Sequence, residues 1–117
     1  MFIPGRIEIL GKHTDYCGGR SIVCAIDRGF RAHVEPRVDS MVVLENTDSS
    51  ETVSVDLAAN SIAPAGHWVN YAAEVGRRLA KNFANHPLNG VTIRFQSDLP
   101  KAAGLSSSSA LMIMVFA

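Results

Sequence analysis

The chain has 117 residues, of which 47% are hydrophobic and 19% are charged. This composition supplies enough apolar side chains for the core of one globular domain and excludes a disordered segment. The 11 basic and 11 acidic residues give a formal net charge of zero. Because nucleic acids and anionic membrane surfaces are bound by clustered Lys and Arg, this balance argues against both as partners.

Two cysteines, Cys17 and Cys24, are too few for a disulfide framework and are not spaced like zinc ligands. We interpret both as core or near-core thiols. The N-terminal residues lack the basic and long apolar segments of a secretory signal. The longest apolar run, at 110–117, is far shorter than the roughly 20 residues of a membrane span. These features predict a cytoplasmic protein.

The first half of the sequence predicts strands, because apolar and polar residues alternate in runs that Gly, Asn, Asp and Ser separate. Residues 11–19 (GKHTDYCGG) are typical of a loop, and residues 46–51 of a polar turn. We expect a meander of antiparallel pairs, with strands at 7–10, 21–26, 30–35, 41–45 and 52–57.

From His67 the period changes to three and four residues, which predicts a helix with one apolar stripe. The stripe consists of Trp68, Tyr71, Ala72, Val75, Leu79 and Phe83. His86-Pro87 and Gly90 should end this helix, and a strand should follow at 91–96.

Residues 110–117 predict a buried helix, and its unbroken apolar sequence suggests that more of a longer protein, or a partner chain, covers it. Strands followed by strand and helix alternation indicate an α+β fold, with helices on one face of a mostly antiparallel sheet.

A serine-rich turn, residues 104–109 (GLSSSS), lies between a predicted strand and the apolar helix. The start of a helix presents unpaired backbone N–H groups and the positive end of its dipole, which suits a phosphate. Gly104 allows the backbone to approach a phosphate closely. Serine hydroxyls can bond phosphate oxygens or Mg²⁺. A flexible linker or plain helix capping is the alternative, although the apolar run that follows counts against a linker.

The loop after the first strand carries an imidazole, a hydroxyl and a carboxylate in His13, Thr14 and Asp15. Such a set can bind the vicinal hydroxyls of a sugar. The alternative is an Asx-type turn with a solvated histidine.

Two further features have a functional and a plain interpretation. Trp68 and Tyr71 are one helical turn apart and could clamp a flat base, although core packing is the commoner use of such a stripe. Arg6 follows a Pro-Gly turn and could brace a phosphate or a catalytic carboxylate, or could lie free on the surface.

Taken together, residues 4–19 (PGRIEILGKHTDYCGG) and 99–110 (LPKAAGLSSSSA) resemble the first two motifs of the GHMP kinases, most closely those of galactokinases. The Trp68-x-x-Tyr71 pair between them resembles the nucleotide-side helix of that family. The resemblance implies a two-domain fold whose N-terminal part is like ribosomal protein S5 domain 2. It also implies ATP-dependent phosphorylation of a small sugar, with ATP and Mg²⁺ as cofactors.

The resemblance also implies roles for individual residues. Arg6 would be catalytic, beside the transferring phosphoryl group, and Ser108 would contact Mg²⁺. The sugar would be bound by Lys12, His13, Asp15 and Gly18, and ATP by Trp68, Tyr71, Gly104, Leu105, Ser106, Ser107 and Ser108.

This sequence departs from the pattern at Lys12, where galactokinases usually carry Glu, at Ala102, which replaces a glycine, and at Ser109, which replaces an alanine. The family's catalytic aspartate and C-terminal domain would lie beyond residue 117, so residues 1–117 are expected to be the incomplete N-terminal part of such a kinase. The alternatives are a non-catalytic sensor that binds sugar and ATP, and an S5-like interaction domain without a small-molecule site.

Overall fold

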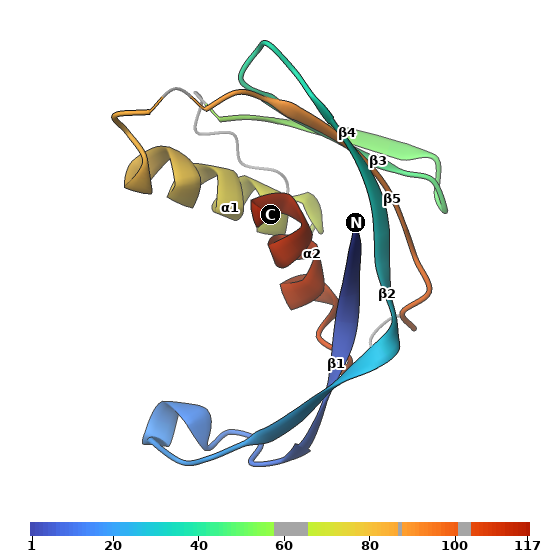
Figure 1. Cartoon of the computed structure of the whole chain (residues 1–117), viewed down its shortest axis with the longest axis vertical. Coiled ribbons are helices and arrows are strands. Elements are labelled where there is room, and N and C mark those ends of the chain that lie inside the picture. The colour runs from blue at the N-terminus through green and yellow to red at the C-terminus, as the bar shows by residue number, and fades with distance from the viewer. Residues whose placement is uncertain (58–65, 87, 101–103) are drawn as a thin grey trace.

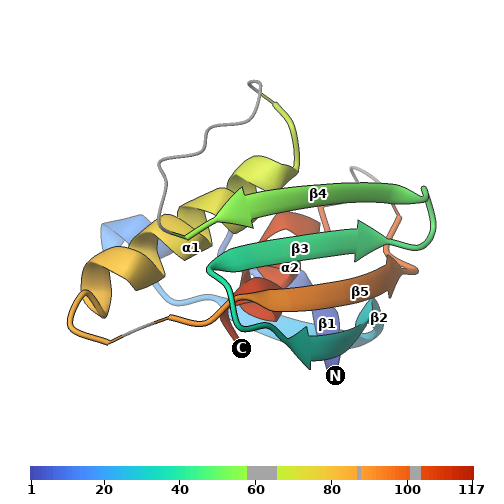
Figure 2. The same ribbon diagram turned by 90° about the horizontal axis from the view of Figure 1, so that it is seen from above.

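Five strands form one sheet, and two helices cover one of its faces (Figures 1 and 2). The computed structural model describes residues 1–57, 66–86, 88–100 and 104–117, with the side chain of Asp15 excepted. The elements in chain order are β1 (Phe2–Leu10), the 3-10 turn η1 (Asp15–Cys17), β2 (Ile22–Pro36), β3 (Met41–Asn46), β4 (Glu51–Asp56), α1 (Val69–Asn82), β5 (Val91–Ser97) and α2 (Ser107–Phe116). The prediction of an α+β fold with helices on one face is confirmed.

The order of strands across the sheet is β1-β2-β5-β3-β4. The neighbouring pairs β1–β2, β2–β5 and β3–β4 are antiparallel, whereas β5 runs parallel to β3. The predicted simple meander is therefore wrong at one place, because β5 is inserted between β2 and β3. Helix α1 connects β4 to β5 and crosses one face of the sheet. The helix buries its apolar side, which includes Val69, Ala72 and Val75.

Strand β2 is one continuous strand of 15 residues, where the sequence predicted two short strands. Gly29 lies at the predicted break and pairs with Pro4 of β1. A Cβ atom at Gly29 would lie 2.1 Å from the carbonyl oxygen of Ile3, so only glycine allows the two strands to approach here. The N–H of Gly29 donates to Oδ1 of Asp98 at 2.7 Å. The polar residues at 27–28 thus lie within β2, at an irregularity where the register between β1 and β2 shifts between Pro4 and Arg6.

The core lies between the sheet and the two helices. Leu44, Ile93 and Met114 are the largest fully buried side chains, and they come from β3, β5 and α2. Helix α2 begins at Ser107, three residues earlier than predicted, so the last three serines of the serine-rich turn are helical. Helix α1 ends at Asn82, and Pro87, which was expected to stop it, lies outside the described residues.

Several apolar side chains remain exposed on this fold. Ile113 and Phe116 of α2 are 53% and 65% exposed. The outer half of the β1–β2 hairpin, which extends away from the helices in Figure 1, exposes Ile9, Leu10 and Ile22. Within the part of the chain that the structure describes, no helix has the length and apolar character needed to cross a membrane.

The interpretation of the cysteines as core or near-core residues is wrong. Cys17 and Cys24 are both free and exposed. Cys17 lies in η1 at the tip of the β1–β2 hairpin, and Cys24 lies on β2 opposite Ile7 of β1.

Candidate functional site

A pocket of about 530 Å³ opens between the starts of α1 and α2 and the sheet. It brings together four residues that the sequence assigned to ATP binding, namely Trp68, Tyr71, Ser107 and Ser108. The remaining lining residues are Phe30, Asn46, Asp48, Ser49, Phe95, Ser97, Leu99, Pro100 and Leu111. One wall is therefore aromatic, and the two ends are polar.

Trp68 and Tyr71 form the α1 side of the pocket. Trp68 is the residue immediately before the helix, and its carbonyl accepts a hydrogen bond from the N–H of Tyr71 at 3.1 Å. The indole packs edge-on against Phe95, with ring centroids 5.7 Å apart. Tyr71 is 45% exposed, so it belongs to the pocket rim and not to the core. Both residues line the pocket, and their contact with the base of ATP stays a prediction.

The polar wall opposite comes from the turn between β3 and β4. Oδ2 of Asp48 accepts a hydrogen bond from the N–H of Ser97 at 2.8 Å, and this bond ties the turn to the end of β5. Asp48 and Asn46 could not be recognised from the sequence, where they belong to an ordinary polar turn. Only the long-range pairing of β3 with β5 brings them to the pocket.

The start of α2 forms the second end of the pocket. Ser106 precedes the helix with a left-handed φ of 58°, and among the described residues its hydroxyl makes no capping bond to the helix. The first N–H groups of a helix have no partner within the helix, and the dipole makes this end positive. Ser107 and Ser108 line the pocket at this end. Gly104 also has a positive φ, of 69°. Ala102 lies outside the described residues.

Arg6 is joined to the serine-rich turn. Its N–H donates to the carbonyl of Leu105 at 3.1 Å, and its Nε donates to the hydroxyl of Ser106 at 3.1 Å. Nearby, the carboxylate of Asp98 accepts bonds from the N–H of Gly29 and from Arg31, and both lower its pKa. Strands β1 and β2 thus fix both ends of the segment that leads to α2.

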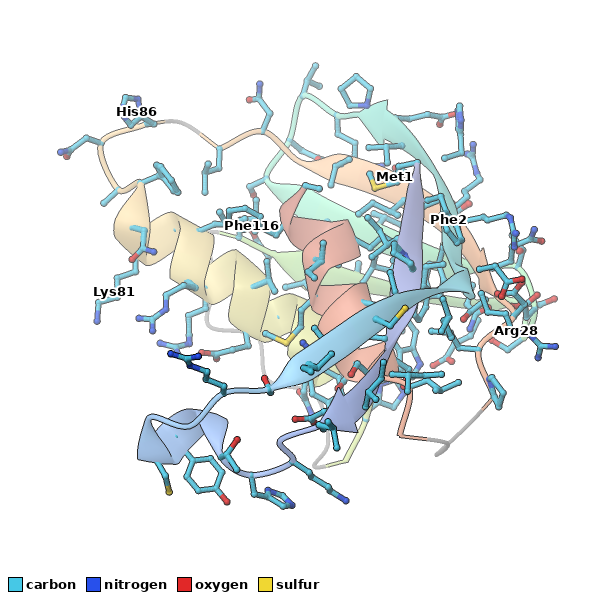
Figure 3. All side chains as sticks on the ribbon, turned by 60° about the horizontal axis from the view of Figure 1, so that its bottom comes forward. Met1, Phe2, Arg28, Lys81, His86 and Phe116 are labelled. Atoms are coloured by element: carbon cyan, nitrogen blue, oxygen red, sulfur yellow. The ribbon has the colours of Figure 1, made fainter. Side chains whose placement is uncertain are left out.

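The residues predicted to bind a sugar lie in a single loop at the tip of the β1–β2 hairpin, which projects from the rest of the fold (Figures 1 and 3). Lys12, His13 and Gly18 are not among the residues that line the pocket. Lys12, His13 and Gly18 are exposed there, and the backbone of Asp15 begins η1. The ring of His13 lies 6.1 Å from that of Tyr16. The hydroxyl of Thr14 donates to the carbonyl of Gly11 at 2.7 Å. The loop therefore has its own internal structure and connects to the pocket through β1 and Arg6.

We searched the described residues for side chains that could together hold a metal ion. Over the described ranges, no group of three or more His, Cys, Asp or Glu side chains could hold a metal ion. Nε2 of His33, on β2, lies 3.4 Å from Oε1 of Glu35 in an exposed contact. A hydroxyl such as that of Ser108 could serve as one oxygen ligand of a Mg²⁺ whose other ligands are phosphates and water.

Two families match separate parts of the chain. The GHMP kinases N terminal domain matches residues 70–117, and the galactokinase galactose-binding signature matches residues 2–36. The resemblance to the GHMP kinases that the sequence motifs predicted is confirmed by both matches. The first match contains α2 and the serine turn before it, and the second contains Arg6 and the hairpin loop.

Curated relatives point to the galactokinases. A galactokinase of Roseiflexus sp. is 38% identical over 114 residues, which are 96% of this chain and 28% of the relative. A galactokinase of Glaesserella parasuis is 34% identical over 115 residues, which are 98% of this chain and 30% of the relative. The chain therefore spans less than a third of the length of these GHMP kinases.

Solved structures agree with the fold. The Lactococcus lactis galactokinase complexed with galactose has a TM-score of 0.81 and 30% identity, covering 97% of this chain and 30% of that one. The Methanococcus jannaschii mevalonate kinase has a TM-score of 0.75 and 22% identity, covering 99% of this chain and 37% of that one. The second similarity bears on the GHMP fold alone.

Proposed function

We propose that this chain is part of a sugar kinase that transfers the γ-phosphoryl group of ATP to a hydroxyl of a monosaccharide. One observation carries the proposal. The pocket places an aromatic wall, Trp68 and Tyr71, next to the start of α2 with Ser107 and Ser108, and Arg6 of β1 is bonded to the turn before that helix.

ATP would lie along this pocket. The base would rest on Trp68 and Tyr71, because aromatic rings bind flat π-systems without needing a fixed hydrogen-bond pattern. The triphosphate would lie at the start of α2, held by N–H groups and hydroxyls of Gly104, Leu105, Ser106, Ser107 and Ser108. Ser108 would contact Mg²⁺, which neutralises charge on the phosphates.

Arg6 would act at the transferring group. Its guanidinium already lies at the serine turn, 3.1 Å from the hydroxyl of Ser106, and it could turn toward a bound phosphate. Phosphoryl transfer depends mainly on positioning and charge stabilisation. The substrate hydroxyl attacks the γ-phosphorus, the bond to the bridging oxygen breaks, and ADP leaves. The base that accepts the hydroxyl proton would lie outside these 117 residues.

The sugar would contact the hairpin loop through Lys12, His13, Asp15 and Gly18. Galactose is the first candidate, because the matched signature is a galactose-binding signature and the Lactococcus lactis galactokinase is complexed with galactose. Lys12 is exposed, and its side chain is a cation that can only donate, so it cannot accept a hydrogen bond from a sugar hydroxyl. The other three residues then carry the recognition.

The remainder of the kinase would cover the exposed apolar surfaces of α2 and the hairpin. The matched relatives are more than three times as long as the region they share with this chain, which is consistent with such a covering part. We place the enzyme in the cytoplasm, because exposed free thiols at Cys17 and Cys24 suit a reducing compartment.

A turnover assay tests the proposal. The longest polypeptide that carries this sequence should release ADP from Mg-ATP when galactose or another monosaccharide is added. No sugar-dependent release with any sugar of a broad panel contradicts the kinase. Binding of ATP and sugar without turnover would instead support the sensor alternative.

A further inference from the structure

The carboxylate of Glu51 connects the sheet to the start of α1. Its Oε2 accepts a hydrogen bond from the indole Nε1–H of Trp68 at 2.9 Å. Its Oε1 lies 3.1 Å from Nε2 of His67. Glu51 is the first residue of β4, which is an edge strand. A single side chain on the rim of the sheet therefore contacts both residues that lead into the helix.

His67 forms the second part of this arrangement. Its Nδ1 accepts a hydrogen bond from the N–H of Val69 at 3.3 Å. A ring nitrogen that accepts carries no proton, so the hydrogen bond from Val69 assigns the proton to Nε2, the nitrogen that faces Oε1 of Glu51. The bond to Val69 also satisfies one of the first N–H groups of α1, for which the helix offers no partner.

These contacts fix Trp68 on three sides. Glu51 binds its N–H, His67 stacks on it with ring centroids 5.8 Å apart, and Phe95 meets it edge-on. The indole nitrogen can only donate a hydrogen bond. Because its N–H is bonded to Glu51, it is not available to a ligand in the pocket. What remains toward the pocket is apolar aromatic surface, which suits a stacked base.

We infer that Glu51 is a positioning residue of the nucleotide site, which holds Trp68 directly and through His67 in the orientation that forms the pocket wall. This inference rests on the proposed function, because it assumes that the base of ATP lies on Trp68. Glu51 itself does not line the pocket, so its effect on the nucleotide acts through the indole.

Calorimetric titration with Mg-ATP tests the inference in the longest polypeptide that carries this sequence. Glu51→Ala should raise the Kd for Mg-ATP by about tenfold, because the apparent affinity falls with the fraction of molecules whose Trp68 is in the binding position. The kcat at saturating Mg-ATP should stay unchanged, since Arg6 and α2 are untouched. Glu51→Gln keeps an acceptor for the indole N–H and should recover most of the affinity.

A spectroscopic signal separates positioning from a merely structural role. The near-UV circular dichroism of Trp68, isolated as the difference from the same protein carrying Trp68→Phe, should weaken in Glu51→Ala and return on saturation with Mg-ATP. Glu74→Ala is the matched control, because Glu74 is an exposed glutamate of α1 that also has a partner, Arg77. It should change neither the Kd nor the Trp68 signal.

The outcomes are distinct. Mg-ATP binding that Glu51→Ala leaves unchanged, or a Trp68 signal that does not respond to this change, overturns the inference alone. A wild-type protein that binds no Mg-ATP overturns the proposed function and this inference with it. If Glu51→Ala fails to fold, Glu51→Asp tests the inference instead. The shorter side chain of Asp cannot contact both Trp68 and His67, so the Kd for Mg-ATP should rise by about threefold or more. An unchanged Kd overturns the inference.

Discussion

Arg6 and Ser106 are 100 positions apart in the sequence and share a hydrogen bond in the structure. This hydrogen bond connects the hairpin that would bind the sugar to the turn that would bind the phosphates of ATP. The family resemblance placed both residues at the phosphates of ATP, but their direct bond could not be predicted, because no local pattern reports which strand will lie beside which turn.

Arg6→Ala is predicted to lower kcat by about 100-fold or more, because it removes a charged donor from the place where charge develops on the transferring phosphoryl group. The KM for ATP should change much less. Steady-state kinetics on the longest polypeptide that carries this sequence measure both. Arg28→Ala is the control, since Arg28 is exposed on β2 and does not line the pocket. Equal kcat values for Arg6→Ala and wild type would remove Arg6 from the catalytic role.

Asp39 gives a prediction on pH. Hydrogen bonds from Arg37 lower the pKa of Asp39 from 3.8 to about 2. A carboxylate whose pKa is lower in the folded state stabilises the fold above its unfolded pKa, and this contribution is lost as the pH falls through the folded pKa. Asp39→Asn should therefore lower the urea midpoint at neutral pH, and the gap to wild type should close between about pH 4 and pH 2. A gap that persists unchanged at pH 2 contradicts this account.

At the scale of elements, the approach of β1 to β2 depends on Gly29. Gly29→Ala should lower the free energy of unfolding by about 3 kcal/mol, because its Cβ would meet backbone atoms of Ile3 and Pro4 that cannot move without separating the strands. Denaturant unfolding measures the loss. A change below about 0.5 kcal/mol, as for an ordinary surface substitution, would show that the hairpin can adjust.

The sequence predicted the strands and both helices because their apolar periods are local. It split β2 at Gly29, since glycine and charged neighbours are typical of a turn, and only the pairing with Pro4 shows why glycine is needed. The place of β5 could not be predicted, because strand order depends on contacts far apart in the chain.

The same limit applies to the site. Trp68, Tyr71 and the serines could be proposed from motif and spacing. Glu51 and Asp48 could not, because each is an unremarkable polar residue until β4 and β5 are placed. The two cysteines were misplaced because free cysteine is usually a buried residue type, whereas both belong to the exposed outer half of the hairpin.

At the scale of the whole molecule, α2 buries one side on the sheet and α1 and leaves the other side open. Phe116→Ser should lower the free energy of unfolding of the longest polypeptide that carries this sequence by about 2 kcal/mol, if further residues of that polypeptide cover this side chain. Val38→Ser, at a fully exposed position in the turn after β2, is the control and should have almost no effect. Equal small effects would show that the face of α2 stays open.

The most direct test of the account is a crystal structure of the longest polypeptide that carries this sequence with Mg²⁺ and a non-hydrolysable ATP analogue. We predict the adenine on Trp68 and Tyr71, the triphosphate at the start of α2 beside Ser107 and Ser108, and Arg6 within reach of the terminal phosphate. An analogue bound elsewhere, with this pocket empty, would contradict it.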